Sequence, residues 1–305
     1  MTPSRRRGRF APSPTGPLHF GSLVAALASY CDARANGGEW LLRIEDVDEP
    51  RSRAGADEAI VRALARYGFR WDGEIVRQSR RTRSYAHALE SLVAKSLAYP
   101  CACTRREVGS AALASTGERI YPGTCRAGLD SVRQTRSERA WRVRVDDTAI
   151  AFVDRLQGAQ SQTLARDVGD FVVRRADGLF AYQLAVVVDD GAQQITDVVR
   201  GADLLSSTPR QIHLQRLLEL PMPAYLHIPV AVSATGEKLS KQTHALALPD
   251  DAVSALLAAW RFLDQPPPAH APSGVTTFWA HAVANWAPGR LPPVRMLPAP
   301  ARFVA

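Results

Sequence analysis

The sequence contains two short motifs of residue types that handle phosphates, and they lie far apart along the chain. The first, His19-Phe20-Gly21-Ser22, follows an extended, proline-containing segment and opens an apolar helical run. Backbone N–H groups and the helix dipole at such a helix start can hold an anion. The second, Lys238-Leu239-Ser240-Lys241-Gln242, is a polar loop whose lysines can place positive charge on phosphate oxygens. Taken singly, the first motif also suits an ordinary strand–helix connection, and the second also suits a solvated surface loop.

Three of the four cysteines form a second cluster of chemically active side chains, at Cys101, Cys103 and Cys125. So few cysteines in a chain of 305 residues are not a disulfide framework. In a reducing compartment a group of thiolates suggests zinc, although the spacing is not that of a common zinc finger and a fourth ligand is needed. Cys31 lies in an apolar helical run, where we expect a buried structural thiol.

The segments around the first motif predict a β–α–β unit. We expect a strand at 7–12, a helix at 20–36 that Gly37-Gly38 ends, and a strand at 39–47 with a continuous apolar centre. Such a unit indicates a doubly wound α/β fold with a parallel, Rossmann-type sheet. Because ligands bind at the carboxyl ends of the strands in these sheets, we expect Arg9, His19 and Glu45 to surround one crevice.

The rest of the chain predicts further elements of this fold and an interruption of it. The expected helices are 54–67, 82–97, 208–220, 252–263 and 276–286, and the expected strands are 141–145, 152–154, 171–174, 180–190, 195–200 and 224–232. We divide the chain into the first half of the catalytic domain (1–99), a small α+β insertion with the zinc site (100–178), the second half with the lysine loop (179–250) and a short helical segment (251–305). Residues from about 288 are rich in proline, and we expect them to be poorly ordered.

The overall charge favours an anionic substrate or a polyanionic partner, since the formal net charge is +8 and the isoelectric point about 9.7. The arginine-rich loop at 77–83 suits either a solvated surface or a contact with an RNA backbone. No apolar signal region follows the N-terminus, and no run approaches the roughly 20 apolar residues of a membrane span. We therefore expect a cytoplasmic protein without a membrane partner, and a monomer.

The two phosphate motifs together resemble the two signatures of class I aminoacyl-tRNA synthetases, because they occur in that order and each follows a strand. The lead-in from Arg9 to His19, with Arg43-Ile44-Glu45-Asp46 and the segment 198–203, narrows the resemblance to the glutamyl branch. The resemblance implies ATP with Mg²⁺ as a substrate. It implies catalytic roles for His19, Gly21, Lys238 and Lys241, and ATP binding by His19, Gly21, Ser22 and Lys241.

The resemblance also implies a pocket for an amino acid. Two arginines, Arg9 and Arg200, and one carboxylate, Glu45, match a ligand with two carboxylates and one ammonium group, which is glutamate or aspartate and not glutamine. Which arginine binds which carboxylate is open, and a structural ion pair between Arg9 and Glu45 is the alternative. The implied glutamate-binding residues are Arg9, Phe10, Ala11, Pro12, Ser13, Glu45, Tyr182 and Arg200. In the same family a tyrosine completes the zinc site, so the implied Zn²⁺ ligands are Cys101, Cys103, Tyr121 and Cys125.

The length of chain after the lysine loop bears on the final acceptor. Only 63 residues (305 − 242) follow Gln242, and we expect no anticodon-binding domain in them. This arrangement resembles the glutamyl-queuosine tRNA(Asp) synthetase family. That resemblance implies transfer of glutamate to the queuosine base in the anticodon loop of tRNA(Asp). Two alternatives stay open, a truncated glutamyl-tRNA synthetase that charges a tRNA 3′ end and a non-catalytic RNA-binding paralogue.

Overall fold

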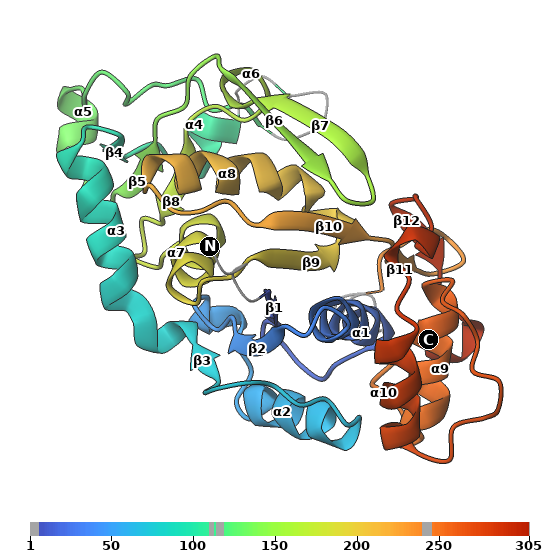
Figure 1. Cartoon of the computed structure of the whole chain (residues 1–305). Coiled ribbons are helices and arrows are strands. Elements are labelled where there is room, and N and C mark those ends of the chain that lie inside the picture. The colour runs from blue at the N-terminus through green and yellow to red at the C-terminus, as the bar shows by residue number, and fades with distance from the viewer. Residues whose placement is uncertain (1–5, 110–112, 114–118, 240–245, 305) are drawn as a thin grey trace.

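The computed structural model describes residues 6–109, 113, 119–239 and 246–304, and a mostly parallel sheet lies at its centre (Figure 1). One part of this sheet has the order β1 (Arg7–Phe10), β2 (Glu39–Ile44), β3 (Val76–Arg77). The other part has the order β9 (Asp197–Gly201), β10 (Ala224–Ile228), β6 (Ala149–Asp154), β7 (Gly158–Thr163), in which only β7 runs antiparallel. The Thr196 N–H donates to the Arg7 carbonyl at 3.0 Å and joins β9 to β1. The chain therefore winds outward in both directions from β1 and β9, which confirms the predicted α/β fold class.

Helix α1 (Phe20–Arg34) lies against the sheet on one side and against α9 (Ala252–Phe262) and α10 (Val275–Ala284) on the other (Figure 1). Its side chains are buried nearly all round because both sides are covered. Tyr30, for example, packs on Trp279 with ring centroids 4.6 Å apart. The predicted helices at 20–36, 252–263 and 276–286 are confirmed to within a few residues.

The prediction of a buried strand at 180–190 is wrong, because this segment forms helix α7 (Tyr182–Ala192). The run Leu184–Val188 is apolar throughout, a pattern that suits a buried strand and equally suits a helix covered on all sides. Helices α3 (Thr82–Ala94) and α8 (Thr208–Leu217) pack on α7 and provide that cover (Figure 1). The helix places Asp189 and Asp190, which are both buried, in its last turn instead of at the end of a strand.

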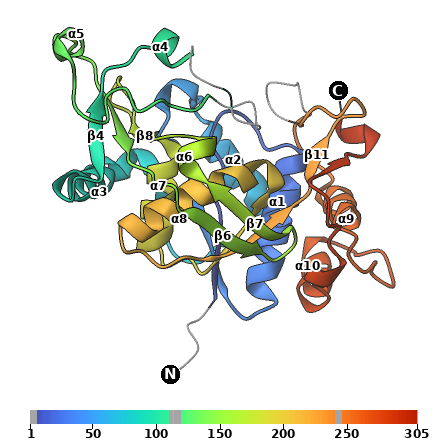
Figure 2. The same cartoon turned by 90° about the horizontal axis from the view of Figure 1, so that it is seen from above.

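The segment 100–178 contributes to two sheets. Strands β4 (Ala98–Cys101), β5 (Ala140–Val143) and β8 (Phe171–Arg174) form a small antiparallel sheet. Short helices accompany it: α4 (Arg105–Gly109), α5 (Ser131–Gln134) and α6 (Leu164–Asp167). In Figure 2, α4 and α5 lie at the end of the molecule opposite α9 and α10. Strand β6 from the same segment instead extends the central sheet beside β10.

The prediction that the chain is poorly ordered from about residue 288 is wrong. Strand β12 (Met296–Pro298) pairs in parallel with β11 (Val230–Val232), which continues β10 beyond a break at Pro229. Pro298 is tolerated in β12 because β12 is an edge strand, where a residue without a backbone N–H is accommodated. Phe303 is buried and stacks on Phe20 at a centroid distance of 4.3 Å, so the end of the chain packs on the start of α1.

Helix α2 (Ala56–Arg66) completes the layer of helices outside β2 and β3, and its buried face consists of Ala56, Ile60 and Leu64. Of the helices in the part of the chain that the structure describes, none is long and apolar enough to cross a bilayer.

Candidate active site

The start of α1 brings the His19 ring over Gly21. His19 precedes the helix in an extended conformation, with φ −122° and ψ 177°. A Cβ atom on Gly21 would lie 3.2 Å from His19 Cε1 and 3.3 Å from Nδ1, which is too close for a side chain without movement of the ring. Gly21 therefore allows the imidazole to lie directly against the helix start, with half-buried Ser22 next to it. The first backbone N–H groups of a helix can bind phosphate, and the His19 ring nitrogens lie beside them. This arrangement suits a nucleotide with phosphates.

Strand β11 brings the first two residues of the lysine motif, Lys238 and Leu239, to this helix start. The turn after it bonds the Ser233 N–H to the Glu237 carbonyl at 2.7 Å, and Gly236 adopts a φ of +83°, which favours glycine. Leu239 is buried and donates its N–H to Ala231. Its carbonyl lies 3.8 Å from the Cβ position of Gly21, so the two motifs meet in space.

Of the two lysines of the second motif, Lys238 lies within the described residues and forms an ion pair. Lys238 Nζ lies 2.6 Å from Asp203 Oδ2, and both side chains are partly exposed. Lys241 lies outside the described residues, so its predicted contact with phosphate stays a prediction. The chain that follows returns to the first motif, because Ala247 pairs with His19 as an antiparallel bridge.

Arg9, at the end of β1, is almost completely buried and pairs with Asp190 of α7 at an Nε–Oδ1 distance of 3.3 Å. Arg43 of β2, which is fully buried, lies 2.8 Å from the same Asp190 oxygen. The structural ion pair of Arg9 is therefore with Asp190, and not with Glu45 as in the alternative drawn from the sequence. Burial alone would raise the pKa of Asp190, but Arg9 and Arg43 outweigh it and hold the pKa below its usual value.

Glu45 follows β2 and lies close to the same arginines. Its Oε1 is 3.3 Å from Arg43 Nη2, and its N–H donates to the Pro12 carbonyl at 3.0 Å. Burial raises the pKa of Glu45, and Arg43 and Arg9 offset this rise only in part. A buried carboxylate that its neighbours compensate incompletely is well suited to a cationic group such as an ammonium.

Arg200, the other predicted arginine, projects from β9 and is held on several sides. Its Nε donates to His227 Nε2 at 3.0 Å, and its Nη2 donates to Thr208 Oγ1 at 2.9 Å. Its Nη1 lies 3.5 Å from the hydroxyl of Tyr182, the first residue of α7. His227 in turn lies 2.6 Å, through Nδ1, from Asp154 Oδ2.

The remaining residues of the predicted glutamate pocket fall into two groups. The Phe10 ring stacks on Trp40 at 6.3 Å within the core, so only its backbone can face a ligand. Ala11, Pro12 and Ser13 follow β1 at the carboxyl edge of the sheet and are half-buried to exposed. Of the predicted residues at this edge, Arg9, Ser13, Glu45, Tyr182 and Arg200 have polar side chains.

Sequence reasoning missed the residues that position Arg9 and Arg200, namely Asp190, His227, Thr208 and Asp154. It also missed that Arg43 shares Asp190 with Arg9. A signal was present for His227, which is a polar residue between Leu226 and Ile228 in the otherwise largely apolar strand Ala224–Ile228. Asp190 carried no usable signal because its segment was predicted to be a strand.

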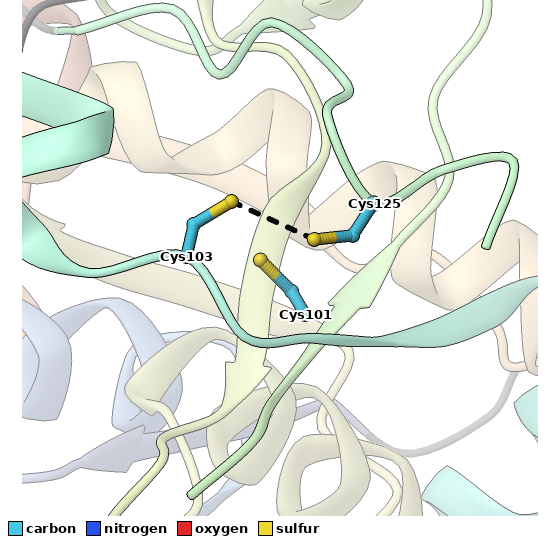
Figure 3. A group of neighbouring side chains, drawn as sticks. All are labelled: Cys101, Cys103 and Cys125. Atoms are coloured by element: carbon cyan, nitrogen blue, oxygen red, sulfur yellow. Dashed lines mark hydrogen bonds between the residues drawn. The ribbon is translucent and has the colours of Figure 1, made fainter. Parts of the chain in front are cut away.

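The three clustered cysteines lie together in the small antiparallel region, with their sulfur atoms all within 4.8 Å of one another (Figure 3). Cys103 Sγ lies 3.5 Å from Cys125 Sγ. The Tyr121 hydroxyl lies 3.3 Å from Cys101 Sγ and 3.7 Å from Cys103 Sγ. Tetrahedral zinc with Zn–S bonds of about 2.3 Å places its ligand atoms about 3.8 Å apart, so these four side chains fit such an ion.

The family of the chain follows from its sequence relatives. The sequence profile of the family "tRNA synthetases class I (E and Q), catalytic domain" matches residues 6–257. The fold agrees, since a glutamate-tRNA synthetase from Elizabethkingia anophelis superposes with a TM-score of 0.81 over 98% of this chain and 69% of its own, at 23% identity. The chain is therefore a class I tRNA synthetase catalytic domain, and the protein is a ligase-type enzyme.

Two relatives narrow this class. The "Glutamyl-Q tRNA(Asp) synthetase" of Aromatoleum aromaticum is 56% identical over 98% of this chain and 94% of its own length. The protein of the same name from Thiobacillus denitrificans is 54% identical over 98% of this chain and 100% of its own. The chain belongs to the glutamyl-Q tRNA(Asp) synthetase family of class I tRNA synthetases.

Proposed function

We propose that this enzyme activates L-glutamate with ATP in the absence of tRNA and transfers the glutamyl group to the queuosine base in the anticodon loop of tRNA(Asp). The observation that carries the proposal is the meeting of two kinds of site at the carboxyl ends of β1 and β9. On one side lie Arg9, Glu45 and Arg200, and on the other lie His19 and Gly21. We propose that the enzyme works as a monomer in the cytoplasm, where its tRNA is.

In the proposed first step, the charges of the pocket select the amino acid. The guanidinium groups of Arg9 and Arg200 bind the two carboxylates of glutamate, and Glu45 accepts its ammonium group. Tyr182 lies beside this set, since its hydroxyl is 3.5 Å from Arg200 Nη1. Glutamine lacks the second negative charge and would leave one arginine uncompensated.

In the proposed activation, a carboxylate oxygen of glutamate forms a bond to the α-phosphorus of ATP, and the bond to the bridging oxygen of pyrophosphate breaks. His19 donates a hydrogen bond to a phosphate oxygen, while Gly21 leaves room for the nucleoside and the helix start with Ser22 faces the phosphates. Lys238 and Lys241 place positive charge near the departing pyrophosphate. Mg²⁺ bound with ATP neutralises further phosphate charge.

The acceptor is the part of the proposal that relatives support more than geometry does. Proteins of this family are named for tRNA(Asp), and queuosine carries a cyclopentenediol whose vicinal hydroxyls resemble those of a ribose. A ribose is the acceptor in the alternative reading, in which the enzyme charges a tRNA 3′ end.

The experiment that separates these acceptors is transfer of labelled glutamate to tRNA(Asp) with and without queuosine. The proposal predicts label that requires queuosine and survives removal of the 3′ adenosine. Label that is independent of queuosine and is lost with that adenosine would establish the alternative.

We further propose a structural Zn²⁺ held by Cys101, Cys103, Cys125 and Tyr121. Bound there, it would tie the end of β4 to the segment 121–125. Metal analysis should find about one zinc per chain, with less in Cys103→Ser. Cys31→Ala, which changes a buried thiol of α1 outside the cluster, should keep the zinc. A metal-free preparation that is stable and active would refute the site.

A further inference from the structure

We propose that Asp154 and His227 are positioning residues that orient the guanidinium group of Arg200 toward the amino-acid substrate. The three residues lie on adjacent strands, β6, β10 and β9, and form one hydrogen-bonded line across the sheet. The inference deepens the proposed function and rests on it, because Arg200 is taken to bind a carboxylate of glutamate.

The Asp154 carboxylate accepts hydrogen bonds from the backbone and from the His227 ring. The His227 backbone N–H lies 3.2 Å from each of its oxygens. Oδ1 accepts the backbone N–H groups of Leu156 and Gln157 at 3.0 and 2.8 Å. Oδ2 lies 2.6 Å from Nδ1 of His227, and both side chains are completely buried. Because an ionised carboxylate can only accept, the ring must carry a proton on Nδ1.

The other ring nitrogen is thereby an acceptor. Nε2 of His227 lies 3.0 Å from Arg200 Nε, which can only donate, and 3.2 Å from the Thr208 hydroxyl, which can donate. A neutral ring with its proton on Nδ1 therefore satisfies all three contacts of the ring. The charged groups around the ring agree with this state. Burial and Arg200 favour the neutral form, Asp154 and Asp203 oppose them, and the pKa of His227 falls to about 4.

The result is a guanidinium group with one nitrogen left for the pocket. His227 holds Nε, and Thr208 and the Leu204 carbonyl hold Nη2 at 2.9 and 3.5 Å. Nη1 faces Tyr182, the residue that also feels the charges of Glu45 and Arg9. Asp154 acts on Arg200 through His227, since it accepts hydrogen bonds from both the ring and the backbone N–H of that residue.

The test is Asp154→Asn, measured as glutamate-dependent ATP–pyrophosphate exchange. In this variant the amide oxygen must accept the N–H groups of Leu156 and Gln157, so the amide NH₂ group faces Nδ1 of His227. Because both groups cannot donate, the ring proton moves to Nε2. Two donors, Nε2–H of His227 and Nε–H of Arg200, then face each other. We expect the KM for glutamate to rise about 10- to 100-fold, the range for partners that orient a binding group, while the KM for ATP stays within about twofold.

Matched variants give the test its control. Asp170→Asn changes another buried aspartate of the same segment, which pairs with Arg126 and Tyr99 instead. It should lower stability without raising the KM for glutamate. His227→Gln, whose amide oxygen can accept from Arg200, should raise that KM less than His227→Leu does. If Asp154→Asn does not fold, the comparison of His227→Gln with His227→Leu tests the positioning role.

Two outcomes would overturn the inference, and they are distinguishable from failure of the proposed pocket. An unchanged KM for glutamate in Asp154→Asn, with a raised one in Arg200→Lys, would refute the positioning role alone. Equal rises in the KM for glutamate and for ATP would show a general loss of structure. An unchanged KM for glutamate in Arg200→Lys would refute the pocket itself.

Discussion

The two sides of the candidate active site are built in different ways. The glutamate side consists of charged side chains, Arg9, Arg43 and Arg200, that are buried and hydrogen-bonded to other buried side chains. The ATP side consists of a helix start, a glycine and a turn that position His19 and Lys238 through backbone pairing.

This difference separates function from stability. A buried ion pair that loses one partner leaves an uncompensated charge, so a change on the glutamate side should cost folding free energy and substrate binding together. A change at the ATP side, which is less deeply buried, should affect the reaction and leave the fold nearly as stable as before.

The largest effect is expected from Asp190→Asn. The substitution keeps the shape but removes the charge that compensates Arg9 and Arg43, both almost completely buried. We expect a loss of about 3 to 5 kcal/mol in the free energy of unfolding and a raised KM for glutamate. Denaturant titration with exchange kinetics measures both, and an unchanged stability would contradict the account of the glutamate side.

A smaller effect is expected from acid. The pKa of His227 is lowered from 6.5 to about 4 in the folded protein, so the unfolded chain binds the extra proton between these values. Stability from this group therefore falls as the pH drops from 6.5 toward 4, by up to about 3 kcal/mol. Titration of unfolding against pH should show a shallower dependence in His227→Gln than in the wild type, and parallel curves would contradict the buried neutral ring.

On the ATP side, Gly21→Ala tests the contact between the helix start and His19. The new methyl group would lie 3.2 Å from His19 Cε1, so the ring must move by a few tenths of an ångström. We expect the exchange rate at limiting ATP to fall about 30-fold, equivalent to about 2 kcal/mol, with the free energy of unfolding nearly unchanged. A loss of stability as large as that of Asp190→Asn would remove the contrast between the two sides.

The smallest effect on stability is expected from Lys238→Gln. Its ion pair with Asp203 is partly exposed, with exposed fractions of 52% and 32% for the two side chains, so the free energy of unfolding should change by less than about 1 kcal/mol. The exchange rate at limiting ATP should nevertheless fall. A rate equal to that of the wild type would mean that Lys238 only holds Asp203.

The same contrast decides how much the sequence could predict. The ATP side rests on local turns and short motifs, and these are visible in a run such as His19–Ser22 or in the glycine of the lysine loop. The strand–helix–strand arrangement around α1 was predictable for the same reason, since apolar runs and glycines mark its ends.

The partners on the glutamate side were not predictable, because they come from distant segments that only the fold brings together. Asp190 binds Arg9 and Arg43 through helix α7, whose apolar run also suits a strand. Asp154 reaches His227 because β6 joins the central sheet, and Gly158–Thr163, the strand after it, has no apolar alternation to announce a hairpin. Near the end of the chain the buried Phe303 stacks on Phe20 of α1, a contact that its proline-rich surroundings did not suggest.

The central claim, that one crevice binds glutamate beside ATP and joins them, is tested most directly by ATP–pyrophosphate exchange without tRNA. The account predicts exchange that depends on glutamate, is not supported by glutamine and has a raised KM for glutamate in Arg200→Lys. Absence of exchange under every tRNA condition, or equal exchange with glutamine, would contradict it.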